Sequence, residues 1–330
     1  MRYRKLGKTG LMVSEVCLGT MLFGDQLGEA ESTEIFNKAI DSGINFVDTA
    51  DVVYAKGRSE EIVGKLIKGG RQSVVLATKV GMAAGPGIND IGLSRKHIMD
   101  GIEGSLRRLG TDYIDLYYVH WWDEGTPIEE TLGALDDVVK QGKVRYIGCS
   151  NFFAWQLCEA LWVSELHNMA RFSCIQSLYN LLSRDIETEL LPLCNYEGVG
   201  ICVYNPLAGG LLTGKHKQDK PPAKGRFAHK RMGSAYKGRY WTPGNFEAVD
   251  QLKKLAQTHG CSLPQFSLAW ILGNEQVTAT IMGASSVRQL EENLIATEIQ
   301  LSEEEQTACD EVWHQLRPPR YFYGSQQLKR

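Results

Sequence analysis

The chain has 330 residues, with 36 Lys or Arg and 39 Asp or Glu, which gives a net charge of -3 at pH 7. This balance leaves no overall positive field that could hold a nucleic-acid polymer or an anionic membrane surface, so we expect neither partner. Hydrophobic residues make up 43% and charged residues 23%, which is typical of a folded globular protein and excludes a mostly disordered chain.

Short β-branched apolar runs alternate with helical patterns along the chain, which predicts repeated βα units around a parallel sheet. The predicted strands span 13–20, 45–50, 74–80, 113–120, 144–151, 172–179, 200–207 and 278–284. In the first predicted helix, Ser32 is the capping residue and Gly43 closes the helix. A second helix runs from Ser94 to Gly110, and a third begins at Pro127. After the last strand, SVRQLEENLIAT and SEEEQTACDEVWHQL also predict helices.

Eight such units without a linker favour one (β/α)8 TIM barrel, a single α/β domain over 1–330, over two doubly wound halves. The exceptional connection is 208–243, which follows the seventh strand and is long and irregular. Long loops in compact domains are usually functional or disordered, and composition leaves a solvated flap and an anion clamp equally open. Against the single acid Asp219, this loop carries nine basic residues: Lys215, Lys217, Lys220, Lys224, Arg226, Lys230, Arg231, Lys237 and Arg239.

Signals for secretion, membrane insertion and metal binding are missing from the sequence. The apolar stretches fall well short of the roughly 20 residues that a spanning helix needs. The basic N-terminus lacks the apolar run of a signal peptide. The eight Cys include no C-x-x-C pair, so we expect reduced thiols and no zinc site. These features predict a cytoplasmic protein without a resident metal.

Four side chains at or near the carboxyl ends of predicted strands could form a catalytic site. Lys79 ends a buried strand and needs a carboxylate partner, and Asp48 ends the neighbouring strand at the same height. The Tyr54 phenol beside that ammonium would have a lowered pKa and could donate a proton. His120 could hydrogen-bond the same substrate oxygen. Each residue alone has a purely structural explanation, and their joint occurrence favours the site.

Seven ordered motifs carry a resemblance to a known family: DTADVVYAKGRSEE, ATKVG, LYYVHWWD, KVRYIGCSN, IQSLYN, YNPLAGGLLTGK and GASSVRQLEEN. They resemble the motifs of aldo-keto reductases, (β/α)8 barrels that bind a nicotinamide cofactor, mostly NADPH, without a Rossmann domain. The branch with the greatest resemblance contains bacterial and plant reductases and potassium-channel β subunits. The resemblance implies that Tyr54 is the general acid, that Lys79 lowers its pKa, that Asp48 holds Lys79, and that His120 positions the carbonyl.

The spacing before Tyr54 departs from the family pattern. In most relatives the tyrosine follows the first aspartate of this motif by five residues, whereas here it follows Asp48 by six, because Val52 and Val53 are doubled. We expect a loop bulge to absorb the extra residue.

The chain has no G-x-G-x-x-G motif, so a dinucleotide must be held in another way. The resemblance implies that Ser150, Asn151 and Gln176 hold the nicotinamide carboxamide and that Tyr204 stacks on the ring. Gly19 and Thr20 are further cofactor-binding candidates. Arg288 favours NADP over NAD, although NAD stays possible. The pyrophosphate would lie along Asn205, Leu207, Gly209, Leu212, Lys215 and Arg226, and the adenosine end along Ser285, Arg288, Gln289, Glu292 and Asn293.

These features predict an NADP-dependent oxidoreductase that reversibly reduces an aldehyde or ketone to an alcohol. Aromatic residues near the barrel mouth could form an apolar substrate pocket: Met21, Phe23, Trp121, Trp122 and Trp241. The alternative is an NADP(H)-binding regulatory or scaffold subunit with slow reductase chemistry. An oligomer is compatible with either function.

Overall fold

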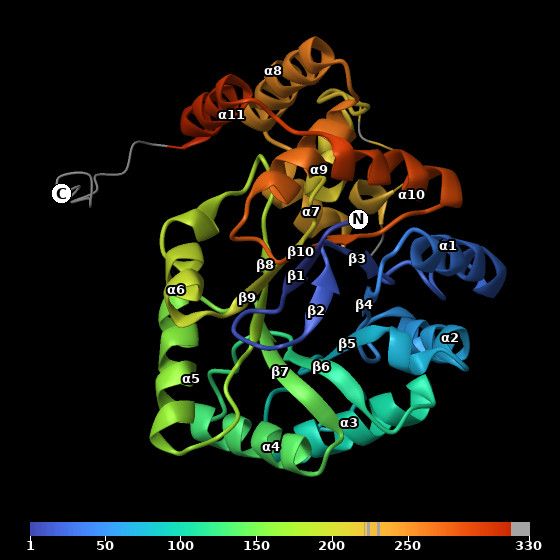
Figure 1. Cartoon of the computed structure of the whole chain (residues 1–330), viewed down its shortest axis with the longest axis vertical. Coiled ribbons are helices and arrows are strands. Elements are labelled where there is room, and N and C mark those ends of the chain that lie inside the picture. The colour runs from blue at the N-terminus through green and yellow to red at the C-terminus, as the bar shows by residue number, and fades with distance from the viewer. Residues whose placement is uncertain (221, 223–224, 230–231, 318–330) are drawn as a thin grey trace.

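The computed structural model describes residues 1–220, 222, 225–229 and 232–317, so Lys224, Lys230 and Arg231 of the basic loop and the tail 318–330 lie outside the described residues. Eight parallel strands form a closed barrel in the order β10-β3-β4-β5-β6-β7-β8-β9 (Figure 1). They are β3 (Val16–Gly19), β4 (Phe46–Asp48), β5 (Val75–Val80), β6 (Ile114–Val119), β7 (Val144–Ser150), β8 (Cys174–Leu178), β9 (Gly200–Tyr204) and β10 (Ala279–Met282). Each strand lies within one of the eight predicted ranges, and the predicted (β/α)8 barrel is confirmed.

A hairpin that the sequence did not separate precedes the barrel. The antiparallel strands β1 (Tyr3–Lys5) and β2 (Met12–Ser14) pair with each other, so the first predicted strand, 13–20, joined β2 and β3. Leu6 and Val13 are buried in the cluster that fills the barrel interior. Because the Lys8 N–H donates to the Gly198 carbonyl (2.8 Å), just before β9, the hairpin closes the end where the strands begin.

Helices surround the barrel. The first six are α1 (Glu29–Asp41), α2 (Arg58–Ile67), α3 (Arg95–Leu109), α4 (Ile128–Lys140), α5 (Ala154–Leu166) and α6 (Leu190–Glu197). The predicted caps Ser94 and Gly110 of α3 and the predicted start at Pro127 are confirmed. Ser32 does not cap α1, because the helix begins one turn earlier at Gly28 and the Ser32 hydroxyl donates to the Gly28 carbonyl (2.6 Å).

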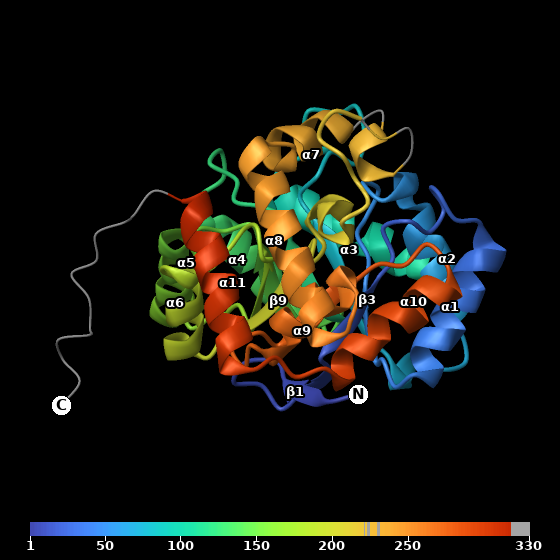
Figure 2. The same cartoon turned by 90° about the horizontal axis from the view of Figure 1, so that it is seen from above.

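Part of the connection 208–243, which was predicted to be irregular, is helical. The whole segment between β9 and β10 is longer and includes two helices that the sequence did not predict. It contains the 3-10 turns Ala208–Thr213 and Arg226–Ala228 and the helices α7 (Gly233–Tyr240), α8 (Pro243–His259) and α9 (Leu263–Gly273). Phe227 and Tyr240 lie in a second buried cluster, which also contains residues of α8, α9 and α11. Figure 2 shows α7 at the end of the molecule opposite β1. The segment therefore covers the carboxyl ends of the strands.

The chain ends its described part with two more helices, α10 (Val287–Leu294) and α11 (Glu303–Leu316), capped by Ser286 and Ser302. None of the helices in the described residues combines the length and the apolar character that crossing a membrane requires.

Alternation along the strands determines which side chains reach the barrel interior. Successive side chains of a strand point to opposite faces, and Phe46, Val75 and Ala77 all lie in the interior cluster. Two residues further along, the same faces carry Asp48 and Lys79. Parallel pairing places Asp48 opposite Ala77, so the two charged side chains enter the interior at the same end of the barrel.

Candidate active site

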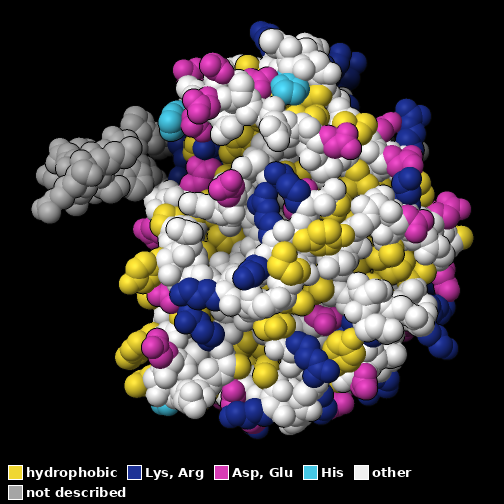
Figure 3. Space-filling view, viewed as in Figure 1, with side chains coloured by type: hydrophobic (Ala, Val, Ile, Leu, Met, Phe, Trp, Pro, Cys, Tyr) yellow, Lys and Arg dark blue, Asp and Glu magenta, His cyan; other side chains and the backbone are white. Residues whose placement is uncertain are grey.

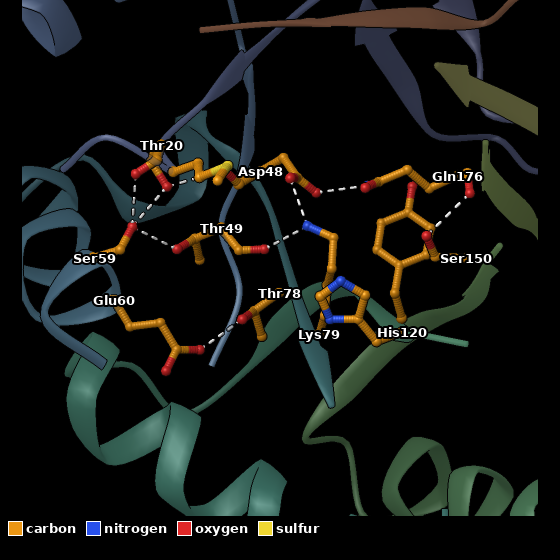
Figure 4. A network of polar contacts seen from close by, with 12 residues as sticks. Thr20, Asp48, Thr49, Ser59, Glu60, Thr78, Lys79, His120, Ser150 and Gln176 are labelled. Carbon is orange, nitrogen blue, oxygen red and sulfur yellow. Dashed lines mark hydrogen bonds and ion pairs between the residues drawn. The ribbon is translucent and has the colours of Figure 1, made fainter. Parts of the chain in front are cut away.

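The predicted Asp48–Lys79 pair exists and is buried at the carboxyl ends of β4 and β5. The Lys79 ammonium donates to Asp48 Oδ1 (2.6 Å) and to the Thr49 carbonyl (2.7 Å), and Gln176 Nε2 donates to Asp48 Oδ2 (2.8 Å) (Figure 4). Lys79 is 1% exposed and Asp48 2%. A charge this deeply buried is tolerated only with such pairing and hydrogen bonding. The pair is therefore preorganised.

Tyr54 lies beside Lys79 despite the six-residue spacing. The extra residue fits in a turn in which the Tyr54 N–H donates to the Asp51 carbonyl (3.1 Å) and the Val53 N–H donates to Asp51 Oδ1 (3.4 Å). This turn takes the place of the predicted bulge. Lys79 Nζ lies 5.3 Å from the centre of the Tyr54 ring.

The Lys79 charge acts on the Tyr54 pKa in the predicted direction, but it does not lower the pKa below its ordinary value. Burial raises the pKa of the phenol, and the Lys79 charge offsets only part of that rise. The reason is electrostatic: Asp48 neutralises much of the Lys79 field, while the loss of solvent penalises a phenolate directly. Tyr54 is therefore a protonated phenol at neutral pH.

His120 follows β6 and faces the same space, beside Lys79 in Figure 4. Burial, reinforced by the nearby Lys79 charge, lowers the pKa of His120 to about 3. The imidazole is therefore neutral in the physiological range. Its Nδ1 is buried and has no hydrogen-bond partner, which leaves a ring nitrogen for a ligand.

The four residues predicted to hold the nicotinamide are linked by hydrogen bonds. The Ser150 hydroxyl donates to the Gln176 carbonyl (3.0 Å), and Asn151 Nδ2 donates to Ser150 Oγ (3.0 Å) and to the His120 carbonyl (2.9 Å). The Tyr204 hydroxyl donates to Asn151 Oδ1 (2.7 Å). Asn151 adopts a φ of 59°, a left-handed conformation that asparagine tolerates better than most residues. The side-chain amide of Gln176 is partly used, because its nitrogen already holds Asp48.

Gly19 and Thr20 lie at the end of β3. A Cβ on Gly19 would come within 2.8 Å of Ile281 Cγ2, so this position has little room for a side chain. The Thr20 hydroxyl donates to the Asp48 carbonyl (3.0 Å) and lies 2.9 Å from the Ser59 hydroxyl. Because Thr20 is fully buried, it acts in this structure by hydrogen-bonding the end of β4 and Ser59.

The predicted pyrophosphate residues line the start of the segment after β9. Asn205 has a φ of 60°, and its Oδ1 accepts from the Gly209 N–H (2.6 Å). Arg226 Nη1 donates to the Tyr236 hydroxyl (2.7 Å) and lies 3.8 Å from Met21 Sδ, so the basic segment reaches back toward β3. Leu207 is half-buried, Leu212 is buried and Lys215 is exposed.

The predicted adenosine residues lie along α10: Ser285, Arg288 and Gln289 at its start, and Glu292 and Asn293 in its last turn. Gln289 Oε1 accepts from both the N–H and the hydroxyl of Ser285 (2.7 and 2.8 Å). Arg288 is paired with Glu292 (2.7 Å) and its side chain is 86% exposed. Asn293 is buried, and its Nδ2 has no partner.

The predicted substrate pocket is only partly assembled. Trp121 is exposed, with its ring 6.0 Å from that of His120. Phe23 is 1% exposed and belongs to the main core, so its assignment to the pocket is wrong. Trp122 is partly buried and packs on Phe152 and Trp155. Trp241 packs on His216, Phe227 and Phe246 as part of the segment after β9. Met21, beside Arg226, stays a candidate.

Sequence reasoning missed a second layer of charges behind the site. Glu60 is fully buried, accepts from the Thr78 hydroxyl (2.6 Å) and pairs with Arg108 (2.7 Å). Asp51 is also buried, and burial together with Glu60 raises its pKa to about 7. Both acids lie within the DTADVVYAKGRSEE motif. For Asp51, the two valines that follow it were the available sequence signal of burial.

A cavity of about 680 Å³ lies elsewhere, lined by Tyr179, Arg184, Trp270 and neighbouring residues. It contains none of the four predicted catalytic residues. Cavity size alone therefore does not locate this site.

Comparison with known proteins identifies the family of the chain. Residues 15–314 match the model of the aldo/keto reductase family. The chain is 40% identical over 307 residues to two plant proteins, each named "Probable voltage-gated potassium channel subunit beta", from Arabidopsis thaliana and from Oryza sativa subsp. japonica. Each match covers 91% of this chain and 92% of the relative. The chain therefore belongs to the aldo/keto reductase family.

Proposed function

We propose that the chain is an NADP(H)-dependent oxidoreductase that reversibly reduces an aldehyde or ketone to an alcohol. The observation that carries this proposal is the buried Lys79–Asp48 pair facing the Tyr54 ring, with an unpartnered His120 nitrogen on the same side. A buried ion pair adds little net stability compared with apolar residues of similar size. A cluster of ionisable groups with shifted pKa values is instead typical of a catalytic site.

The residues around the strand ends fit a nicotinamide dinucleotide. The hydrogen-bonded side chains of Ser150, Asn151 and Tyr204 offer polar groups to the nicotinamide carboxamide beside the catalytic residues. Arg226 and Lys215 supply positive charge for the pyrophosphate. At the other end, the N-terminus of α10 is suited to a phosphate. In the last turn of the same helix, Asn293 Nδ2 is a buried donor without a protein acceptor. A bound nicotinamide would supply the hydride.

The protein's own groups would handle the proton. Tyr54, protonated at neutral pH, donates its hydroxyl proton to the substrate oxygen as charge develops there. Two of the three Lys79 N–H groups are held by Asp48 and Thr49, so the ammonium is fixed where it stabilises the remaining phenolate. The neutral His120 ring hydrogen-bonds the same oxygen and orients it. Because the pKa of Tyr54 is raised, the phenol keeps its proton at neutral pH, which is the form that a proton donor needs.

Replacing Tyr54 tests this proposal. Tyr54→Phe keeps the ring beside Lys79 and removes the proton, so we expect kcat for an aldehyde with NADPH to fall by about 10²–10⁴. The Kd for NADPH should stay within about twofold, because general acid catalysis concerns the chemical step. Near wild-type turnover in Tyr54→Phe would contradict the proposal.

A second candidate function rests on the comparisons. Both reported plant relatives are named as potassium-channel β subunits, so the chain could bind NADP(H) as a sensing or scaffold subunit with slow chemistry. Titration of NADPH followed by turnover on a panel of aldehydes and ketones separates the two functions. Tight binding with negligible turnover on every carbonyl would favour the subunit, whereas turnover that Tyr54→Phe abolishes would favour the reductase.

A further inference from the structure

Helix α5 presents an apolar stripe to the outside of the molecule. Trp155, Trp162 and Leu166 are 59%, 64% and 61% exposed, and Cys158 is exposed between them. Spacings of three, four and four residues place all four on one side of an α-helix. The opposite side is buried against the barrel through Leu157, Ala160, Leu161, Val163 and Ser164. The helix is therefore apolar on both sides, which is typical of a helix that is covered on both sides.

The stripe continues at the start of the helix, where Phe153 is 69% exposed. We call Phe153, Trp155, Cys158, Trp162 and Leu166 the α5 face. Figure 3 shows hydrophobic side chains at the left edge of the molecule, where Figure 1 places α5 and α6. Of the twelve large hydrophobic residues that are exposed in the described part of the chain, four belong to this face.

The area of the α5 face matches one side of a protein–protein interface. A fully buried aromatic side chain removes about 150–250 Å² from solvent, so the four large side chains, each about two-thirds exposed, present roughly 500 Å². A standard interface buries about 800 Å² per partner, of which about 65% is apolar in homodimers. The α5 face alone therefore provides the apolar part of such an interface.

We propose that the α5 face is a two-fold interface between two copies of this chain. The other exposed large hydrophobics of the described residues are scattered over the N-terminal hairpin, the loop after β5, the barrel mouth, α6 and the turn after α10. No comparable patch within those residues could receive the α5 face in a head-to-tail contact. The surface that fits it is the same face on a second copy, which gives a closed, isologous dimer.

The charges of the helix disfavour a lipid surface as the occupant. The charged residues of α5 are Glu159 and Glu165, whereas helices that lie on anionic membranes are rich in Lys and Arg. In an antiparallel pair of α5 helices, these acids lie at the rim and the stripe at the centre. Because the contact is apolar, added salt should not dissociate it.

The proposal is tested by measuring the mass of the protein in solution over a range of concentrations. We expect a dimer, and Trp162→Glu should weaken it by at least about thirtyfold, as for a central aromatic residue of an interface. The matched control is Ile88→Glu, since Ile88 is 91% exposed outside this face and its replacement should leave the dimer intact. A monomer at every concentration, or a dimer that Trp162→Glu does not weaken, would overturn the proposal.

Cysteine chemistry gives a second measurement that does not depend on how Trp162→Glu folds. Packed helices lie about 8–10 Å apart, so the two Cys158 thiols near the two-fold axis should be joined by a short bis-maleimide. The other free cysteines of the described residues are buried or partly buried. A covalent dimer in the unmodified chain that disappears in Cys158→Ser supports the interface. A crosslink that persists in Cys158→Ser, or none at concentrations where a dimer exists, overturns it.

Discussion

The two halves of the proposed cofactor site are built differently. At the strand ends, Asp48, Lys79 and Gln176 are buried and their hydrogen bonds are already made within the protein. At the adenosine end, Arg288 is exposed and its charge is paired with Glu292 on the same helix. The chemistry is therefore preorganised by the barrel core, whereas the nucleotide contacts must form when a ligand arrives. Mutations at the strand ends should affect stability and catalysis together, and mutations at α10 should affect binding alone.

The largest effect is expected from removing Lys79. Lys79→Met leaves the Asp48 carboxylate buried without its partner, which should lower the free energy of unfolding by about 3–5 kcal/mol. Turnover should also fall by at least about a thousandfold, since the phenolate of Tyr54 loses its stabilising charge. Denaturant unfolding and steady-state kinetics measure the two effects.

The double variant Asp48→Leu/Lys79→Met separates stability from catalysis. Replacing both members of a buried ion pair by apolar residues is often neutral for stability. We expect stability to recover while turnover stays low. Recovery of turnover as well would show that the pair is structural and would remove the distinction between the two halves of the site.

The ionised form of Asp51 should lower the free energy of unfolding, because its carboxylate is buried beside Glu60. Its pKa is raised to about 7 from an ordinary value of 3.8, so between these values the folded protein binds a proton that the unfolded chain has released. Stability therefore falls as the pH rises through 7. Asp51→Asn imitates the neutral acid and should raise the free energy of unfolding at pH 8.5 by up to about 4 kcal/mol, with little change at pH 4. An equal effect at both pH values would contradict the assignment.

His120 should give the opposite pH dependence. Its pKa is lowered to about 3 from an ordinary 6.5, so between these values the unfolded chain binds a proton that the folded protein does not. Stability falls as the pH falls, by up to about 1.4 kcal/mol per pH unit for this group. His120→Asn should flatten that slope in urea unfolding measured from pH 6.5 to 4. The exposed His167→Asn is the control, and a slope equally reduced there would contradict the role of burial.

The elements that sequence predicted correctly depend on local pattern. All eight barrel strands were found because each is a short apolar run between helices, and alternation then placed Asp48 and Lys79 on the inner face. The predicted first strand joined β2 and β3 because only a single residue, Glu15, separates them, and apolar residues of the two strands lie on both sides of this break. Glu15 is buried with Arg2 as its ion-pair partner (2.7 Å), and no local signal reveals that tertiary contact.

The features that sequence could not predict depend on burial. The direction of the Tyr54 pKa shift depends on two opposing effects. Loss of solvent raises the pKa, whereas the Lys79 charge lowers it. Phe23 was placed in the pocket because an aromatic residue after a strand end has no local sign of being in the core. Outward-facing Trp162 and inward-facing Leu161 are equally apolar neighbours, so only the fold shows which one is exposed.

The smallest effect, and the sharpest test of the nucleotide half, is expected from Arg288. Its guanidinium lies in solvent, where two unit charges about 4 Å apart interact with about 1 kcal/mol. Arg288→Ala should therefore raise the Kd for NADPH by about fivefold and leave kcat and the free energy of unfolding unchanged. The Kd for NADH should not change if the guanidinium recognises the extra phosphate, and the difference between the coenzymes should shrink as salt screens the exposed charges. Arg107→Ala, on the outer side of α3, controls for loss of one positive charge. If Arg288→Ala weakened the binding of NADPH and NADH equally, Arg288 would contact the pyrophosphate or stabilise α10. The preference for NADP would then have to come from the basic segment after β9.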